Sequence, residues 1–445
     1  MSFDLPILGV GLLWEHPLVI FALMIFIGTL IYLFTNGMLI SAPGFSLFVF
    51  SLSSILVLFP LLVYSSNRDY VLSNPCQWYI LGIAVTWAIA VMGFMRKPSP
   101  DISYPELRWR FVPQRVWLVL LALACLLDPI ITIVRFGKIG LIHGNEMMGA
   151  GGSHADVITA ATVIGWECGS VASTMLQTDF FVSRVSWKEF LFQRRKWFDL
   201  GLVLFCLACN STTGNRFILV MNVLCFASGL AIFGRLRTRP ALVGATILLV
   251  FFTVIGNYRI GRADIKEKLT FETQIKFLDS SLGWIATYTE PIFPTLDTFL
   301  QNAPSPAWGG AWLNNIGPTV LRGTILNKDR SSPIEEMYEI IPHFGLTFRT
   351  MYSDLIFDFG DVGSLIVGMV ILFLSIILYN RSTQSARSLA IYLNTFQMFA
   401  FMPLLATFYT QVPFMSFAIT LVVSTYAPPQ VDTEIEETQD LPNLV

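Results

Sequence analysis

Long apolar stretches separated by short polar segments dominate the chain. A stretch of roughly 20 apolar residues is long enough to cross the hydrocarbon core of a bilayer as a helix. A transmembrane β-barrel would instead show short segments of alternating polarity. The pattern therefore predicts an all-α integral membrane protein, a polytopic bundle of about eleven spans. The predicted spans are 17–34, 46–64, 77–95, 116–134, 158–180, 198–213, 217–233, 240–257, 355–379, 388–409 and 411–427.

Basic residues concentrate in alternate connections between these spans. The connections 96–115, 181–197, 234–239 and 380–388 hold 15 of the 28 lysines and arginines. Short loops rich in Lys and Arg face the cytoplasm. We therefore expect these four connections in the cytoplasm and the long polar stretch between the eighth and ninth spans on the opposite side.

This topology divides the chain into four parts. Residues 1–257 form the N-terminal transmembrane helices, 258–353 a large periplasmic loop, 354–428 the C-terminal transmembrane helices, and 429–445 an acidic cytoplasmic tail. Apolar residues at helical spacing in the loop predict amphipathic helices at the membrane surface. These residues are Trp284, Ile285, Ile292, Phe293, Leu296, Phe299 and Leu300.

Composition narrows the class of protein. Hydrophobic residues make up 54% of the chain and charged residues only 13%, and the formal net charge of −2 argues against nucleic acid as a partner. The six cysteines fall mostly inside apolar runs and are interpreted as small buried side chains. There is no P-loop, dinucleotide-binding fingerprint or HExxH motif, which disfavours an ATP-driven pump or a cytoplasmic sugar-nucleotide transferase.

A polar turn between two short spans is the first candidate site. It runs from Ser211 to Arg216, with Gly214 permitting a tight turn and Asn215 before the arginine. Arg216 opens the next predicted helix, and a guanidinium beside a helix N-terminus attracts phosphate. The alternative is an arginine that anchors the helix among lipid headgroups.

A second pair of arginines follows at the end of the eighth span. Arg259 and Arg262 lie three residues apart, on one helix face, next to Tyr258. Two guanidiniums on one face can bind a diphosphate through paired hydrogen bonds. Interfacial anchoring is again the alternative.

The third candidate region precedes the C-terminal spans. His343 is a possible general base, because a neutral imidazole accepts a proton from a hydroxyl group, although a lone histidine is often structural. Arg349 and Tyr352 follow it and are supporting candidates.

Three acids open the ninth span. Asp354, Asp358 and Asp361 follow the spacing i, i+4, i+7, which predicts one shared helix face. Such a face either lines a polar cavity or pairs with the arginines as a structural contact. Gly360 and Gly363 predict close approach of helices nearby. Asp128, Glu167 and Asp179 are further acids in predicted spans, and whether each is neutral, paired or functional stays open.

The order of these motifs resembles the O-antigen, or oligosaccharide repeat-unit, polymerases of the bacterial inner membrane, including the enterobacterial common antigen polymerase branch. The resemblance covers chiefly residues 205–370. It rests on Gly214-Asn215-Arg216, Tyr258-Arg259, the segment from Thr289 to Asn302, His343-Phe344-Gly345 and the segment from Tyr352 to Ile366.

The resemblance implies a fold and an activity. The fold would be similar to GT-C glycosyltransferases, and the enzyme would be metal-independent and without a cofactor. The growing glycan on undecaprenyl diphosphate would be transferred to a new lipid-linked repeat unit on the periplasmic face, alongside a chain-length regulator protein. Arg216, Arg259 and Arg262 would bind the diphosphate, and His343, Asp354 or Asp358 would deprotonate the acceptor hydroxyl.

Two other functions fit the same pattern. An O-antigen ligase-like transferase would use the same lipid carrier and pass the glycan to another acceptor. A flippase for lipid-linked oligosaccharides is the third possibility, although the chain shows no internal repeat of the kind that transporters carry.

Overall fold

The computed structural model gives the positions of part of the chain. The acidic tail and most of the predicted periplasmic loop lie outside it. The described residues are 16–35, 50, 54–55, 58, 72–94, 114–137, 160–211, 216–233, 235, 243–244, 246–247, 250, 253–254, 292–302, 306, 308–310, 350–382, 385–400, 402–403 and 416–421.

The described part is helical and contains no strand, in agreement with the predicted all-α class. Three helical segments are long and apolar enough to cross a membrane, namely Asn74–Met92, Gln114–Val134 and Met351–Ser382. The larger count of about eleven spans stays a prediction. The elements are α2 (Pro17–Thr35), α4 (Asn74–Phe94), α5 (Gln114–Phe136), α8 (Ala160–Ser183), the π-helical turn η3 (Glu189–Gln193), α9 (Trp197–Ser211), α10 (Arg216–Ile232), α14 (Ile292–Asn302), α17 (Met351–Ser382) and α18 (Ala386–Ala400).

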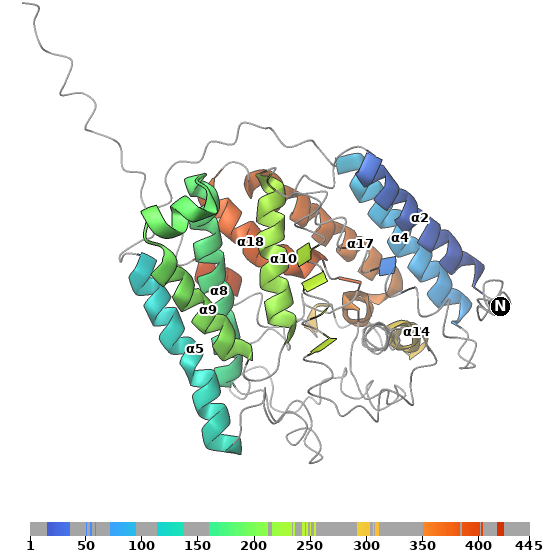
Figure 1. Cartoon of the computed structure of the whole chain (residues 1–445). Helices are drawn as coiled ribbons and strands as arrows, with labels where there is room; N and C mark the ends of the chain where they lie inside the picture. Colours follow the sequence, from blue (N-terminus) through green and yellow to red (C-terminus); the bar gives the residue numbers. More distant parts are fainter. Residues whose placement is uncertain are drawn as a thin grey trace, which may run out of the picture.

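The helices pack around two apolar cores (Figure 1). Helices α2, α4 and α14 and most of α17 surround the first core. Helices α5, α8, α9, α10 and α18, together with Tyr379 of α17, surround the second. Leu378 packs against both cores, and α17 contacts α18. The C-terminal part of α17 therefore joins the two groups of helices.

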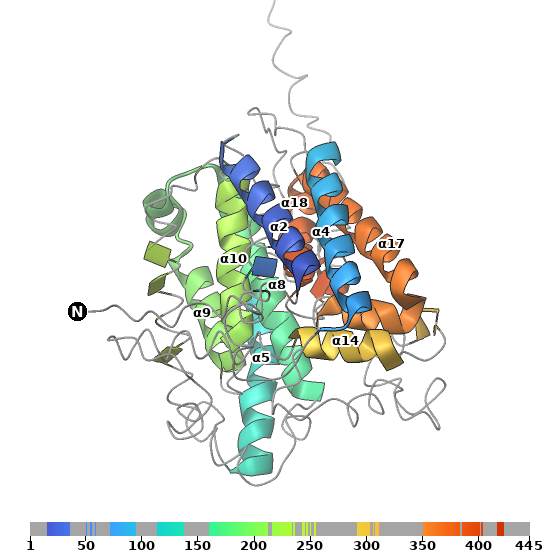
Figure 2. The same ribbon diagram turned by 90° about the vertical axis from the view of Figure 1, so that its right-hand side faces the viewer.

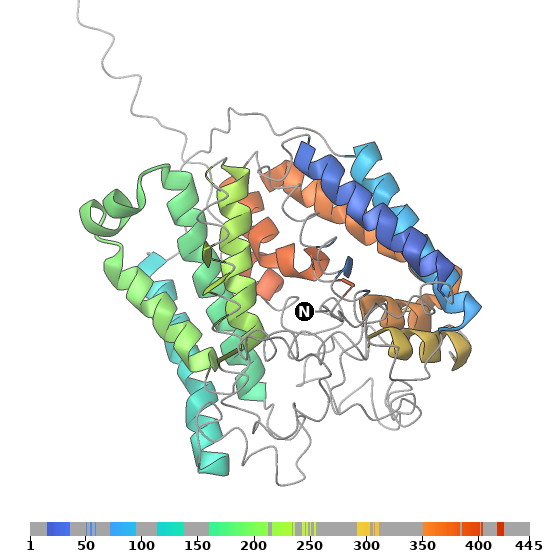
Figure 3. The ribbon, with the colours of Figure 1, turned by 45° about the vertical axis from the view of Figure 1, so that its right-hand side comes forward.

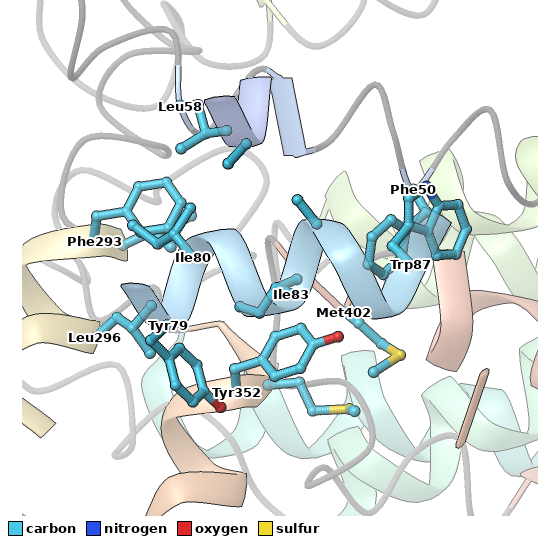
Figure 4. Packing of buried hydrophobic residues seen from close by; sticks show 14 of the residues in the cluster. Phe50, Leu58, Tyr79, Ile80, Ile83, Trp87, Phe293, Leu296, Tyr352 and Met402 are labelled. Carbon is cyan, nitrogen blue, oxygen red and sulfur yellow. The ribbon is translucent and has the colours of Figure 1, made fainter. Parts of the chain in front are cut away.

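Part of the second predicted span is seen beside α4. Phe50 stacks on Trp87 with 3.8 Å between ring centroids, and Leu58 lies toward Ile80, nearer the start of α4 (Figure 4). Phe50 and Leu58 thus follow one another in the direction opposite to α4. This direction agrees with a predicted span at 46–64 that connects α2 back to α4.

Helix α8 lies at the centre of the second core. Its residues 165–176 are all buried, and they include the polar side chains of Glu167, Ser170, Ser173 and Thr174. Gly169 allows α9 to come close, because a Cβ there would overlap the side-chain amide of Asn210. Asp128 and Glu167 are buried within this group of helices.

One end of the bundle carries a network of charged groups, which we call the basic end and define by Arg115, Lys196 and Arg235. Here α5, α9 and α18 begin, and α4, α8, α10 and α17 end (Figures 1 and 3). Lys196 Nζ lies 2.7 Å from Asp179 Oδ2, so this acid is paired. The arrangement brings the residues that adjoin the four basic connections to the same end.

The carboxylate of Asp199 joins two helices at the basic end. It accepts a hydrogen bond from Arg115 Nε at 2.9 Å and lies 3.4 Å from Lys196 Nζ. We expect Asp199→Ala to lower the free energy of unfolding by about 1–2 kcal/mol, because both cations lose a buried acceptor. Thermal unfolding in detergent measures this change. Glu189→Ala is the control and should change stability by less than about 0.5 kcal/mol; equal losses in the two variants would contradict the prediction.

Candidate functional site

Helix α17 consists of two helical parts that meet at Gly360. The backbone of Gly360 has φ 73° and ψ −179°, a conformation open almost only to glycine. Residues 351–359 run crosswise to the rest of the bundle and beside α14, whereas 361–382 run along the bundle (Figures 1 and 2). The crosswise part lies at the end of the bundle opposite the basic end, which we call the α14 end.

The break at Gly360 removes regular helix hydrogen bonds, and other groups replace them. In an unbroken helix the Asp358 carbonyl would accept from the N–H of Val362. Here the Val362 N–H donates to Asp361 Oδ1 at 2.8 Å, and the Asp358 carbonyl accepts from the Trp308 N–H at 2.7 Å. The backbone around Trp308 is thereby fixed to the bend in α17.

The prediction that three acids share one helix face is wrong. Asp354 and Asp358 lie on the crosswise part and are fully buried. Asp361 follows the bend, begins the long part and is exposed. The spacing i, i+4, i+7 implies a common face only in a continuous helix, and Gly360 interrupts it.

The glycines near the bend also differ from expectation, because a Cβ at Gly363 would meet the Phe359 Cβ of α17 itself at 3.0 Å and no atom of another described helix. Gly360 and Gly363 were predicted to permit close helix approach. The nearest atom to a Cβ at Gly360 would be Pro306 Cγ at 3.6 Å, an ordinary contact, so its positive φ is what requires glycine. Close approach occurs instead at Gly368, where a Cβ would come within 2.8 Å of the Tyr352 ring.

The start of α17 is held by the backbone carbonyl of Met402. The Thr350 hydroxyl and the Met351 N–H both donate to this carbonyl at 3.0 Å, and the Tyr352 N–H donates to Thr350 Oγ1 at 3.2 Å. These bonds use donors that a helix N-terminus leaves without intrahelical partners. They fix the start of the crosswise part, and the Trp308 N–H that donates to the Asp358 carbonyl fixes its other end.

Tyr352, a predicted supporting residue, is packed in the first core. Its ring meets that of Tyr79 edge to face, with 6.2 Å between centroids (Figure 4). The Tyr79 hydroxyl lies 2.6 Å from Ser364 Oγ on the long part of α17. The ring of Tyr352 therefore positions the crosswise part against α4 and Gly368.

Sequence reasoning missed the buried carboxylate of Asp297. It lies on α14 and is 1% exposed. It accepts hydrogen bonds from the Ser73 N–H at 3.0 Å, from the Ser73 hydroxyl and from Gln301 Nε2 at 2.9 Å. Ser73 directly precedes α4, and its hydroxyl accepts from the Cys76 N–H at 3.4 Å as an N-cap does. The sequence did contain a signal for this residue, because Asp297 is the one acid among the apolar residues of the helical repeat at 292–302.

Helix α14 is helical with an apolar face, as the spacing predicted, and this face packs on the first core; a position at the membrane surface stays a prediction. Ile292, Phe293, Leu296 and Phe299 are buried in the first core (Figure 4). The carboxylate of Asp297 lies near the N-terminus of α4, where the helix dipole favours negative charge. Apolar packing and this polar contact together hold α14 across the ends of α4 and α17.

The structure describes only some of the remaining predicted site residues. Arg216 is the first residue of α10, as predicted, but its side chain is not described. Tyr352, Asp354 and Asp358 lie together on the crosswise part of α17, and a position close to the arginines stays a prediction. Six further candidates lie outside the described residues: Asn215, Tyr258, Arg259, Arg262, His343 and Arg349.

Within the described part, no group of three or more His, Cys, Asp or Glu side chains is arranged to hold a metal ion. Comparison of the chain with protein-family models, with curated proteins and with solved structures finds no match. Fold and composition define the class: a helical protein whose long apolar helices are suited to a membrane. The candidate site is the crosswise part of α17 together with α14.

A double-mutant cycle tests the contact between Asp297 and Ser73. We expect Asp297→Ala and Ser73→Ala to interact with a coupling energy of about 1–2 kcal/mol, because each variant removes the partner of the other. Thermal unfolding of the wild type, the two single variants and the double variant gives this energy. Asn302→Ala is a control on the exposed face of α14, and additive losses for Asp297 and Ser73 would exclude the contact.

The conformation of Gly360 predicts how a substitution there changes stability. Gly360→Ala should lower the free energy of unfolding by about 1–3 kcal/mol, since alanine is strained at this φ. Gly201→Ala is the matched control: its Cβ would meet nothing within 4 Å, and alanine in a helix should stabilise by up to about 1 kcal/mol. Chemical unfolding in detergent measures both. A neutral Gly360→Ala variant would mean that α17 is continuous.

Proposed function

We propose that the chain is a polymerase of lipid-linked oligosaccharides, a metal-independent glycosyltransferase in the bacterial inner membrane. It joins a growing glycan on undecaprenyl diphosphate to a new lipid-linked repeat unit. The proposal includes about eleven spans, a GT-C-like arrangement and an active site on the periplasmic face. It rests on the resemblance of the motif order between residues 205 and 370, combined with the position of two buried carboxylates.

The observation that carries the proposal is the bend that separates Asp354 and Asp358 from the long part of α17. The long part extends from Asp361 to Arg381, both exposed. Twenty residues of helix measure about 30 Å, the thickness of a bilayer core. Between the two charges, exposed apolar residues recur at helical spacing and suit contact with lipid: Val362, Ile366, Val370, Leu374 and Ile377.

This length supports a membrane boundary at the bend. The crosswise part of α17 and helix α14 then lie along the membrane surface at the α14 end. The basic end would face the cytoplasm, because short basic loops do so. The buried acids would thus stand on the periplasmic side, where a lipid-linked glycan presents its diphosphate and its sugar at the headgroup level.

The proposed reaction is a single displacement. A hydroxyl oxygen of the acceptor sugar bonds to the anomeric carbon of the donor. The bond from that carbon to the diphosphate oxygen breaks, and the diphosphate leaves with the electron pair, which inverts the anomeric centre. His343, Asp354 or Asp358 takes the hydroxyl proton. Arg216, Arg259 and Arg262 stabilise the charge that builds on the diphosphate.

A complementation experiment tests this function. A deletion strain carrying Asp354→Asn, Asp358→Asn or Arg216→Ala should make single repeat units and lose the polymer ladder on a gel of surface glycan. Asp361→Asn is the matched control, because Asp361 is exposed beyond the bend and asparagine keeps an Oδ1 that accepts from the Val362 N–H; it should leave the ladder unchanged. The amount and the elution profile of each variant in detergent separate loss of activity from loss of folding.

The same gel distinguishes the other functions. If the deletion removes even the single repeat unit from its final acceptor, the chain is a ligase-like transferase or a flippase. If the deletion leaves the ladder intact, the polymerase proposal is wrong. If Asp361→Asn alone abolishes the ladder while Asp354→Asn and Asp358→Asn do not, the crosswise part of α17 is not the site.

A further inference from the structure

The connection between α8 and α9, residues 184–196, forms a folded projection beside the bundle at the basic end (Figures 1 and 3). It contains the π-helical turn η3, a rare element that often occurs at functional sites. Arg184 and Arg195, near its two ends, have φ of 54° and 52°. Arginine seldom adopts this left-handed conformation, so surrounding contacts must hold it.

Three contacts fix this connection to the helices. Arg235 donates hydrogen bonds to the carbonyls of Arg184 at 2.9 Å and Val185 at 3.3 Å. Phe190 is fully buried, with its ring 5.3 Å from that of Phe180. Arg115 Nη2 donates to the Arg195 carbonyl at 3.5 Å. The connection therefore presents its outer side chains from a defined backbone.

Its outer surface is basic. Arg184, Lys188, Arg194 and Arg195 are exposed, and the structure gives their side chains no acidic partner among the described residues. Lys196 differs, because it is paired with Asp179 and Asp199. The one acid of the connection, Glu189, is partly buried. Within the described part of the chain, the surface thus carries a net positive charge that no acidic side chain neutralises.

Large aromatic side chains lie between these charges. Phe192 is 71% exposed and Trp197 61% exposed, and Trp187 is also exposed. Aromatic rings mixed with basic residues are typical of the zone where lipid headgroups meet acyl chains. The adjoining helices support a position of the connection at the headgroup zone. Val116 and Val119 of α5 and Leu204 of α9 are exposed apolar residues just inside the basic end, where acyl chains would begin.

We propose that the α8–α9 connection is a binding surface for anionic phospholipid headgroups. Arg184, Lys188, Arg194 and Arg195 bind the phosphates, and Phe192 enters the boundary between headgroups and acyl chains. A soluble polyanion would use the charges but would gain nothing from the exposed aromatic rings, which is why a lipid is the favoured ligand. The inference stands independently of the proposed polymerase activity.

Native mass spectrometry of the full chain in detergent, with phosphatidylglycerol or phosphatidylcholine added, tests the surface. The wild type should retain phosphatidylglycerol in preference to phosphatidylcholine. Arg194→Gln/Arg195→Gln should weaken phosphatidylglycerol binding at least tenfold, at about fivefold per charge. Phe192→Ser should also weaken it. Among the described residues, the side chains of Arg194 and Arg195 make no hydrogen bond or ion pair, so the variants are expected to elute as the wild type does.

Arg381→Gln/Arg387→Gln is the matched control. It removes two exposed charges from the same end, outside the connection, and should stay within twofold of the wild type. An equal loss in the control would mean that charge is sensed over the whole end and would overturn the proposal. Displacement of phosphatidylglycerol by inorganic phosphate at equal concentration, with no effect of Phe192→Ser, would assign the surface to a soluble anion and overturn it as well.

Discussion

A helix that bends at the edge of an apolar bundle must replace the hydrogen bonds that the bend removes, because unsatisfied backbone groups are costly away from water. In α17 the replacement comes from two sides. Asp361 supplies an acceptor for the N–H that follows the bend, and Trp308 supplies a donor for the Asp358 carbonyl that precedes it. The bend thus requires a segment distant in sequence, and the candidate site exists only where the two segments meet.

The N-terminus of α4 likewise depends on a segment distant in sequence, because the Asp297 carboxylate of α14 binds it. Its bonds to Ser73 complete the N-terminus of α4 with groups from α14, so the helix end and the loop helix stabilise each other. Apolar packing alone would leave α14 free to slide, since one aliphatic contact resembles another. A buried hydrogen-bonded carboxylate specifies one position, because misplacement leaves it without partners. Asp354 and Asp358 are held beside α14 for this reason.

Sequence reasoning predicted the parts of the fold that depend on local pattern. Helices α4 and α5 follow apolar runs of membrane-spanning length, and α14 follows a helical repeat of Ile292, Leu296 and Phe299. The bend at Gly360 could not be predicted in this way: a glycine within an apolar run is compatible with a straight helix, and the positive φ depends on Trp308, some fifty residues away. The same holds for Asp297, whose partner Ser73 lies 224 residues earlier.

The acidic residues at the two ends of the bundle have different surroundings. At the basic end, Asp179 is paired with Lys196, and Asp199 is paired with Lys196 and Arg115. Such pairs orient helices and leave little capacity for chemistry. At the α14 end, Asp354 and Asp358 lie on a short helix set apart from the long apolar one. Buried carboxylates are expensive to keep in an apolar setting, so Asp354 and Asp358 require polar neighbours, and the bend places the short helix that carries them at the end of the bundle instead of along its apolar length.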